Sequence, residues 1–199
     1  YHSHQVEGLI CILFYINHKS IKMNKLFFFL LFLSLFACNS EDVEESIVDE
    51  SAGMGLIINE FLASNENCCP DSSGDYDDWV ELYNDSNEPI DIGGMYFTDN
   101  IDDDDPYQIP NSYPSVTTIQ AKGYLLIWCD DDQEQGPLHV SKKLKKSGES
   151  IILLSEENKT IIDSYAFGEQ TTDVSMGRDP TNVKEWVFFD NPTPGSVNN

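Results

Sequence analysis

The sequence is poor in positive charge. It holds 11 Lys and Arg residues against 35 Asp and Glu residues among 199, a formal net charge of -24. Such a surface repels the phosphates of nucleic acids and the headgroups of anionic lipids. The composition therefore argues against nucleic acid as a partner and suits solubility, hydration or the binding of divalent cations.

Motifs that signal catalysis are missing as well. The sequence contains no GxSxG, no HExxH, no CxxC and no zinc-finger spacing. From residue 55 onward it has one histidine, His139, so a histidine-dependent triad would rest on that residue alone. Paired carboxylates for glycoside cleavage need a cleft, and no large insertion is present to build one. We expect no enzyme, and an undetected hydrolase is the remaining enzymatic alternative.

The main apolar run is too short to span a bilayer. Residues 26–37 are apolar except for Ser34, and they follow Met23 and a short cationic segment that contains Lys25. A membrane-spanning helix needs about 20 apolar residues, so this pattern is typical of a signal peptide over residues 23–37. We expect residues 1–22 to be upstream sequence that is not part of the natural protein.

The end of the apolar run carries a second signal. It stops at Ala37-Cys38, a small residue followed by cysteine, which resembles the lipobox of bacterial lipoproteins. That resemblance implies a lipid anchor on Cys38, and the alternative is ordinary secretion with a coincidental cysteine. The following "NSEDVEE" resembles an acidic surface-export signal. We expect an exported protein on the outer membrane or cell surface, with residues 38–54 as a flexible acidic tether.

The cysteines that remain are odd in number. Loss of residues 1–37 would leave 34 acidic and 8 basic residues, a net charge of -26, and the cysteines Cys68, Cys69 and Cys129 beyond the anchor. Three cysteines allow one bridge at most. A bridge from Cys129 to Cys68 or Cys69 is geometrically easier than one between neighbours. Three free thiols are the alternative.

Residues 55–199 have the texture of one all-β domain. Short segments rich in Ile, Val, Thr and aromatic residues alternate with turn sequences, and no sustained helical repeat appears. About 145 residues are enough to bury a core. We predict an antiparallel β-sandwich with strands at 56–63, 78–84, 90–99, 107–110, 117–121, 123–129, 138–142, 150–156, 161–167 and 185–190.

Glu81 is the most conspicuous carboxylate within a strand. In "DWVELYN", Val80 and Leu82 share one face while Glu81 lies on the other. If Val80 and Leu82 face the core, Glu81 faces solvent or a loop and has a structural role. Burial without a partner would cost several kcal/mol. Arg178, one of very few cations in this acidic chain, is the predicted partner in that case.

Acidic clusters are the main chemical feature, and one of them comprises Asp71, Asp75, Asp77 and Asp78. Two loops that each follow a strand carry a predicted cation site, and neither matches the EF-hand pattern. Ca²⁺ is the expected ion because it takes hard oxygen ligands. Solvated loops without a site are the alternative. The candidate ligands are Asp99, Asp102, Asp103 and Asp104 in the first loop and Asp130, Asp131 and Asp132 in the second.

Several segments, in order, resemble the lamin tail domain. They include "LIINEFLASN", "DWVELYNDSNEPIDIGGMYFTDN", "TTIQAKGYLLIWCDDD", the "GES" turn at 148–150 and the closing "TPG" at 193–195. The resemblance extends over residues 56–198 and implies an immunoglobulin-like β-sandwich without catalytic residues. Nuclear members of the family associate with DNA and proteins. This chain departs from them in its strongly negative charge.

The expected function is that of a binding or structural module on the cell envelope. A calcium-dependent carbohydrate-binding or adhesion module is the alternative, with strand aromatics such as Tyr83, Tyr124 and Trp128 as a sugar-stacking surface. The basic "KKLKK" at 142–146 is interpreted as a partner for neighbouring acids rather than a polyanion site. The sequence names neither the protein or glycan ligand nor the oligomeric state.

Overall fold

The computed structural model describes residues 55–157 and 159–199. The chain divides into two units, residues 1–48 and 49–199, and the described residues belong to the second. The predicted signal peptide, Cys38 and the tether to residue 54 lie outside the described residues, and they stay predictions.

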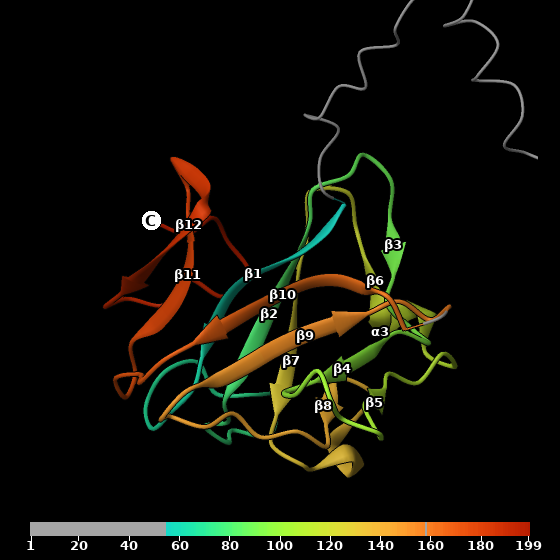
Figure 1. Ribbon diagram of the computed structural model, residues 1–199, viewed down its shortest axis with the longest axis horizontal. Coiled ribbons are helices and arrows are strands. Elements are labelled where there is room, and N and C mark those ends of the chain that lie inside the picture. Colours follow the sequence, from blue (N-terminus) through green and yellow to red (C-terminus); the bar gives the residue numbers. More distant parts are fainter. Residues whose placement is uncertain (1–54, 158) are drawn as a thin grey trace, which may run out of the picture. The chain divides into compact units, whose positions relative to one another are not determined.

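The described residues are nearly all β (Figure 1). The helical elements among them are two single turns, α3 (Pro114–Thr117) and η1 (Gln133–Gln135). The strands are β1 (Leu56–Leu62), β2 (Trp79–Asn84), β3 (Ile90–Asp91), β4 (Tyr96–Thr98), β5 (Tyr107–Gln108), β6 (Thr118–Ile119), β7 (Tyr124–Cys129), β8 (His139–Val140), β9 (Glu149–Leu154), β10 (Ile161–Phe167), β11 (Ser175–Asp179) and β12 (Asn182–Phe189).

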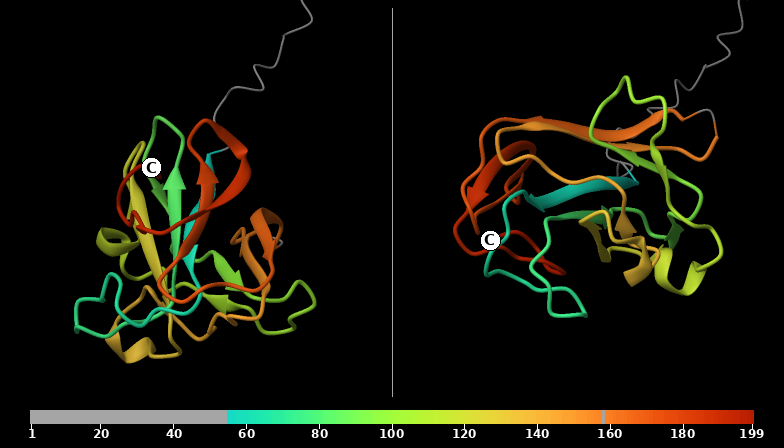
Figure 2. Two further views of the ribbon diagram at one scale, coloured as in Figure 1. Left: turned by 90° about the vertical axis from the view of Figure 1, so that its left-hand side faces the viewer. Right: turned by 90° about the horizontal axis from the view of Figure 1, so that it is seen from below.

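The strands form two main sheets that face each other (Figure 2). The larger sheet has the order β12-β11-β1-β2-β7-β8, the smaller has the order β10-β9-β4-β5, and β3 pairs with β6 in a separate ribbon. All pairs are antiparallel except β7 with β8, which is parallel. The predicted all-β, immunoglobulin-like sandwich is confirmed.

Alternation along the strands builds the core between the sheets. Val80 and Leu82 of β2 point into it and are fully buried, as the sequence pattern predicts. They meet Ile151 and Leu153 of β9 in the same core, and Phe97 of β4 completes this contact. Burial of each such side chain stabilises the fold by about 2 kcal/mol.

A β-bulge interrupts the alternation in β1. Ile58 is opposite Leu82, but the next pair is Glu60 opposite Glu81, so Asn59 is an extra residue in β1. A bulge places two successive side chains on one face. Ile58 and Phe61 consequently both reach the core, while Asn59 and Glu60 both lie on the opposite face of the sheet.

The structure departs from the predicted strands in several places. The predicted strand at 90–99 is divided into β3 and β4, which lie in different sheets. "SMGRD" forms β11, which pairs with both β1 and β12, although Met176 and Gly177 do not give a strand-like pattern. Thr117 belongs to α3 rather than to a strand, because Pro114 opens a helical turn there. β11 thus owes its structure to the strands on either side of it, whereas α3 follows from the local proline.

The "GES" turn depends on its glycine. Gly148 has a φ of +105°, and a Cβ atom there would lie 2.6 Å from the carbonyl oxygen of Phe167. A residue with a side chain would therefore be strained by its backbone and blocked by β10. The turn sets the start of β9 against the end of β10, where Glu149 is opposite Phe167.

Candidate functional site

Two carboxylates are fully buried side by side in the larger sheet. Glu60 of β1 and Glu81 of β2 are opposite each other, and each has 0% of its surface exposed. The bulge at Asn59 brings Glu60 to the same face as Glu81. This face points away from β9 and β10, and the C-terminal segment after β12 runs along it (Figure 2).

The C-terminal segment supplies hydrogen-bond donors to Glu81. The main-chain N–H of Gly195 donates to Oε2, and the amide of Asn59 donates to Oε1 at 2.8 Å. Burial raises the pKa of Glu81 to about 7, the two hydrogen bonds oppose this rise, and the charge of Glu60 adds to it. Glu81 therefore changes charge near neutral pH.

Glu60 is held by donors from two segments. The hydroxyl of Ser175 in β11 donates to Oε1, and the main-chain N–H of Thr193 lies 3.1 Å from the same oxygen. The hydroxyl of Thr193 donates to Oε2 at 2.9 Å. Both oxygens thus have partners, as a buried carboxylate requires.

Asn198 closes the segment against the sheet. Its amide donates to the carbonyl oxygen of Arg178 at 2.8 Å, and its side-chain oxygen accepts from Asn59 at 2.8 Å. Gly177 permits this approach, because a Cβ atom there would lie 2.7 Å from Nδ2 of Asn198 and 2.9 Å from the carbonyl oxygen of Asn59. We call Asn59, Glu60, Glu81, Thr193, Gly195 and Asn198 the C-terminal clasp.

The clasp corrects the sequence interpretation of Glu81. The sequence predicts that Glu81 faces either solvent or a loop. It faces a loop, and its contacts are structural. The predicted ion pair with Arg178 is wrong, because neutral donors of Asn59 and Gly195 take both carboxylate oxygens. Sequence reasoning missed Glu60. A glutamate next to apolar residues, as in "NE" and "VE", is too common a pattern to mark a buried carboxylate.

Arg178 instead joins the two sheets. Its Nη2 donates to Asp163 of β10 at 2.7 Å, and Nε donates to the carbonyl oxygen of Ile58 at 2.7 Å. Asp163 in turn accepts the N–H of Ile58 at 2.8 Å. Both main-chain groups of Ile58 are thereby satisfied beside the bulge, and Trp186 lies under the guanidinium at 5.0 Å. The pair is largely buried, with 9% and 11% of the side chains exposed.

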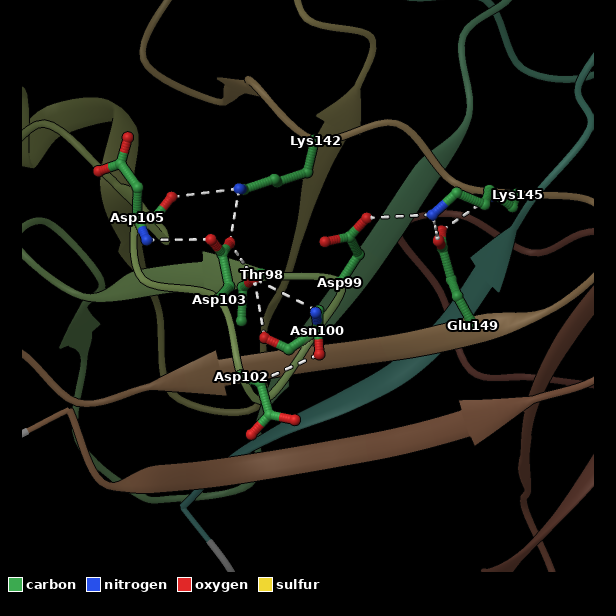
Figure 3. A network of polar contacts seen from close by, with 9 residues as sticks. All are labelled: Thr98, Asp99, Asn100, Asp102, Asp103, Asp105, Lys142, Lys145 and Glu149. Atoms are coloured by element: carbon green, nitrogen blue, oxygen red, sulfur yellow. Dashed lines mark hydrogen bonds and ion pairs between the residues drawn. The ribbon is translucent and has the colours of Figure 1, made fainter.

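The acidic loop after β4 is occupied by lysines (Figure 3). Lys142 binds Asp103 at 2.6 Å, and Lys145 lies 3.6 Å from Asp99 and 2.8 Å from Glu149. The hydrogen bond from Lys142 is the main cause that lowers the pKa of Asp103 to about 2. These contacts agree with the interpretation of "KKLKK" as a local partner of acids. A cation on this loop would have to displace an ammonium group from Asp103.

The second acidic loop holds a buried pair. Nδ1 of His139 lies 2.5 Å from Oδ2 of Asp130, and the side chains are only 6% and 4% exposed. Asp131 and Asp132 follow at the surface, and both contact glutamines of the same turn. Between residues 55 and 199, residue 158 excepted, no group of three acidic, histidine or cysteine side chains is close enough to hold a metal ion. The seven predicted ligands are therefore not gathered into one ready site.

The cysteines differ from the expected pairing. Cys68 is bonded to its neighbour Cys69, and Cys129 is a free, buried thiol in the core. A bridge from Cys129 is wrong because its side chain points between the sheets, with 2% of the residue exposed. Burial raises the pKa of Cys129 well above its ordinary value, and nearby Asp78 and Asp130 add to this effect.

The aromatic residues divide between core and surface. Trp79 is fully buried, and Tyr165 stacks on Trp186 at 3.8 Å between ring centres. Tyr83 and Tyr124 are opposite each other on β2 and β7, and their rings stack at 4.7 Å while both remain partly exposed. Trp128, the third residue named for the expected sugar-stacking surface, is partly exposed as well and stacks on His139.

The comparison with protein families decides the relationship. The family model of the Lamin Tail Domain matches residues 50–169, which is more than half of the chain. The chain belongs to the lamin tail domain family. The predicted resemblance is confirmed over β1 to β10, whereas β11, β12 and the C-terminal clasp lie beyond the matched range. No curated protein matches the chain.

Membership describes an immunoglobulin-like module of a non-enzymatic family. In the part of the chain that the structure describes, no helix is long and apolar enough to cross a membrane.

Proposed function

We propose that this protein is a lipid-anchored protein of the cell envelope whose lamin tail domain acts as a non-catalytic binding or structural module. The observation that carries the proposal is the C-terminal clasp. Glu60 and Glu81 are the kind of paired carboxylates that hydrolases use, but both are fully buried under the C-terminal segment. Their hydrogen bonds hold the fold together, which supports a structural role for them.

The anchor rests on the sequence before the domain. An apolar run ends at Ala37-Cys38, and an acidic stretch follows that is suited to a tether between lipid and domain. A thioether-linked diacylglycerol and a further acyl chain would hold the protein on the membrane durably, whereas one chain binds only marginally. The net charge of the domain would keep it away from the anionic surface, at the end of the tether.

Metabolic labelling tests the anchor. The gene is expressed in a bacterium fed with a labelled fatty acid, and we expect label on the full chain and loss of the label in Cys38→Ser. Ser40→Ala, two residues away, is the control that should keep the label. A wild-type protein without label, or a labelled Cys38→Ser variant, would refute lipidation at this residue. Protease treatment of intact cells then separates a surface location from an internal one.

A calcium-dependent carbohydrate-binding or adhesion module is the second candidate. The partly exposed Tyr83–Tyr124 stack favours it, because adjacent aromatic rings on a sheet surface offer a flat apolar platform to a sugar ring. An array of glycans and proteins, probed with and without calcium, separates the two candidates. Glycan binding that is lost in Tyr124→Ala and kept in Tyr113→Ala, an exposed tyrosine elsewhere, would favour the second.

A further inference from the structure

The end of the larger sheet contains buried carboxylate oxygens that lack partners. Oδ2 of Asp71 and Oδ2 of Asp77 are inaccessible to solvent, and neither has a hydrogen-bond partner among the described residues. Asp71 as a whole is 7% exposed. An isolated buried carboxylate oxygen is costly, so it calls for a proton or a cation.

The strand register places these acids next to Asp130. Trp79 of β2 is opposite Trp128 of β7, and the N–H of Cys129 donates to the carbonyl oxygen of Asp78 at 2.8 Å. One step further along each chain, Asp77 comes beside Asp130. Asp77 thus lies at the end of the loop that precedes β2, and Asp130 lies at the start of the loop that follows β7. Both are at the same end of these two neighbouring strands.

Asp71 reaches the same place from the loop between β1 and β2. Its Oδ1 accepts the N–H groups of Ser73 at 2.9 Å and Asp75 at 2.8 Å, which fixes the carboxylate and leaves Oδ2 free. Asp71 and Asp77 are close enough for the charge of Asp71 to raise the pKa of Asp77. His139, the partner of Asp130, acts on both of them in the opposite direction.

The electrostatic balance of this cluster is unfavourable as it stands. Burial is the main cause that raises the pKa of Asp77, and the charges of Asp130, Asp71 and Asp75 add to it. Burial also acts to raise the pKa of Asp71, but main-chain N–H donors outweigh it and the net shift is downward. Asp71 therefore stays ionised with one buried oxygen unpaired. Two neighbouring carboxylates thus each bury an oxygen without a donor, and a single divalent cation between them would provide a partner for both oxygens.

We propose that Asp71 and Asp77, beside Asp130, form a binding site for a divalent cation of the calcium class. Ca²⁺ takes six to eight oxygen ligands, including main-chain carbonyls and water, and tolerates irregular geometry. Mg²⁺ demands a near-ideal octahedron, which a loop of this kind suits less well. A further buried oxygen without a partner, Oε1 of Gln135, lies on the η1 turn between Asp130 and His139.

The acids of this cluster are not at metal-binding separation in the structure. No three acidic, histidine or cysteine side chains in residues 55–157 and 159–199 already stand at metal-binding separation. The ion would draw the carboxylates of Asp71 and Asp77 together and take its remaining ligands from carbonyl groups and water. This site shares only Asp130 with the cation site predicted from the sequence. Asp103, another of the predicted ligands, is bound by Lys142 in the structure. It is also independent of what the module binds.

Thermal melting of the full chain tests the site. Protein treated with EDTA and dialysed is melted against rising CaCl₂, and in parallel against MgCl₂. We expect a saturable rise in Tm with calcium, as binding to the folded state alone requires, and a smaller rise with magnesium. Tm that does not respond to millimolar calcium would overturn the proposal.

Two isosteric variants and one control locate the ion. Asp77→Asn and Asp71→Asn each keep the side-chain shape and remove one charged ligand, so we expect the calcium affinity to fall about tenfold or more. Asp104→Asn makes the same charge change on an exposed residue of the other acidic loop and should leave the calcium response intact. A response that survives in Asp77→Asn, or disappears in Asp104→Asn, would refute the assignment.

A direct measurement covers the case in which a variant fails to fold. Calorimetric titration of wild-type protein with CaCl₂ at about pH 7.5, where carboxylates are ionised, should show binding near one ion per chain. Circular dichroism of each variant decides whether it is folded before its titration is interpreted. Absence of binding heat at two temperatures would overturn the proposal. A Tm of Asp77→Asn above that of wild type under calcium saturation would overturn it too, since it would show that Asp77 needs only a proton.

Discussion

Replacement of Glu81 by glutamine should change how the stability of the protein depends on pH. Glu81 is fully buried, and its oxygens accept hydrogen bonds from Asn59 and Gly195. Glutamine has the same shape and no charge at any pH. It places an N–H₂ group near one of two donors and so loses a hydrogen bond, at a cost of about 1–3 kcal/mol. This cost is the same at every pH and cancels when two pH values are compared.

The pH-dependent part follows from the pKa of Glu81. Its folded-state pKa is about 7 against 4.5 for the free side chain. A raised pKa means that the folded protein binds the proton more tightly than the unfolded chain. The corresponding stability is fully present below pH 4.5 and is lost as the pH rises through 7. One pKa unit corresponds to about 1.4 kcal/mol, so the loss amounts to about 3 kcal/mol.

Urea unfolding between pH 4.5 and pH 8, within the window set by this pKa, measures the effect. As the pH rises over this range, the unfolding free energy of Glu81→Gln should increase by about 3 kcal/mol relative to that of wild type. With a slope of about 2 kcal/mol per molar urea, the relative midpoint shifts by about 1.5 M. Glu169→Gln, an exposed glutamate with the same charge change, controls for the high net charge. A difference that stays flat, or that moves toward wild type, would refute the reasoning.

Three further predictions concern other parts of the sandwich. Breaking the buried pair by Arg178→Gln or Asp163→Asn should each cost about 3 kcal/mol, with strong coupling in a double-mutant cycle; Arg178→Gln combined with Glu81→Gln should be additive within about 0.5 kcal/mol. Gly177→Ala should lower the unfolding free energy by about 1–3 kcal/mol because its Cβ collides with Asn198. Gly168→Ala, where a Cβ meets nothing within 4 Å, should be nearly neutral by the same urea assay. Alkylation of the unfolded, unreduced chain followed by mass spectrometry should label Cys129 and leave Cys68 and Cys69 unlabelled, whereas label on Cys68 would contradict their bond.

The fold could be predicted from the sequence because its signals are local. Apolar and polar residues alternate in "DWVELYN", and the side chains of Val80 and Leu82 lie in the core as that alternation requires. The glycine of the "GES" turn is also a local signal, since Gly148 has a positive φ. β11 was missed because its strand structure comes from pairing with β1 and β12, which sequence alternation does not record.

The candidate site could not be predicted in the same way, because its contacts join distant segments. Thr193 follows Glu60 by 133 residues, and Asn198 follows Asn59 by 139. The bulge that turns Glu60 outward has no sequence mark, so the second carboxylate stayed hidden. Arg178 was assigned to Glu81 as the scarce cation, but charge alone does not tell which of many acids an arginine reaches.

The clasp and the acidic end of the larger sheet both bury carboxylates, but they differ in whether every carboxylate oxygen has a hydrogen-bond donor. In the clasp, neutral donors from the C-terminal segment satisfy two buried glutamates, and the remaining cost appears as the raised pKa of Glu81. Around Asp71 and Asp77, by contrast, two carboxylate oxygens are buried without any donor among the described residues. Every carboxylate oxygen of Glu60 and Glu81 has a donor from the chain itself, whereas Oδ2 of Asp71 and Oδ2 of Asp77 need a partner from outside the chain. Two of the many carboxylates in the sequence therefore lie where a cation would complete the structure.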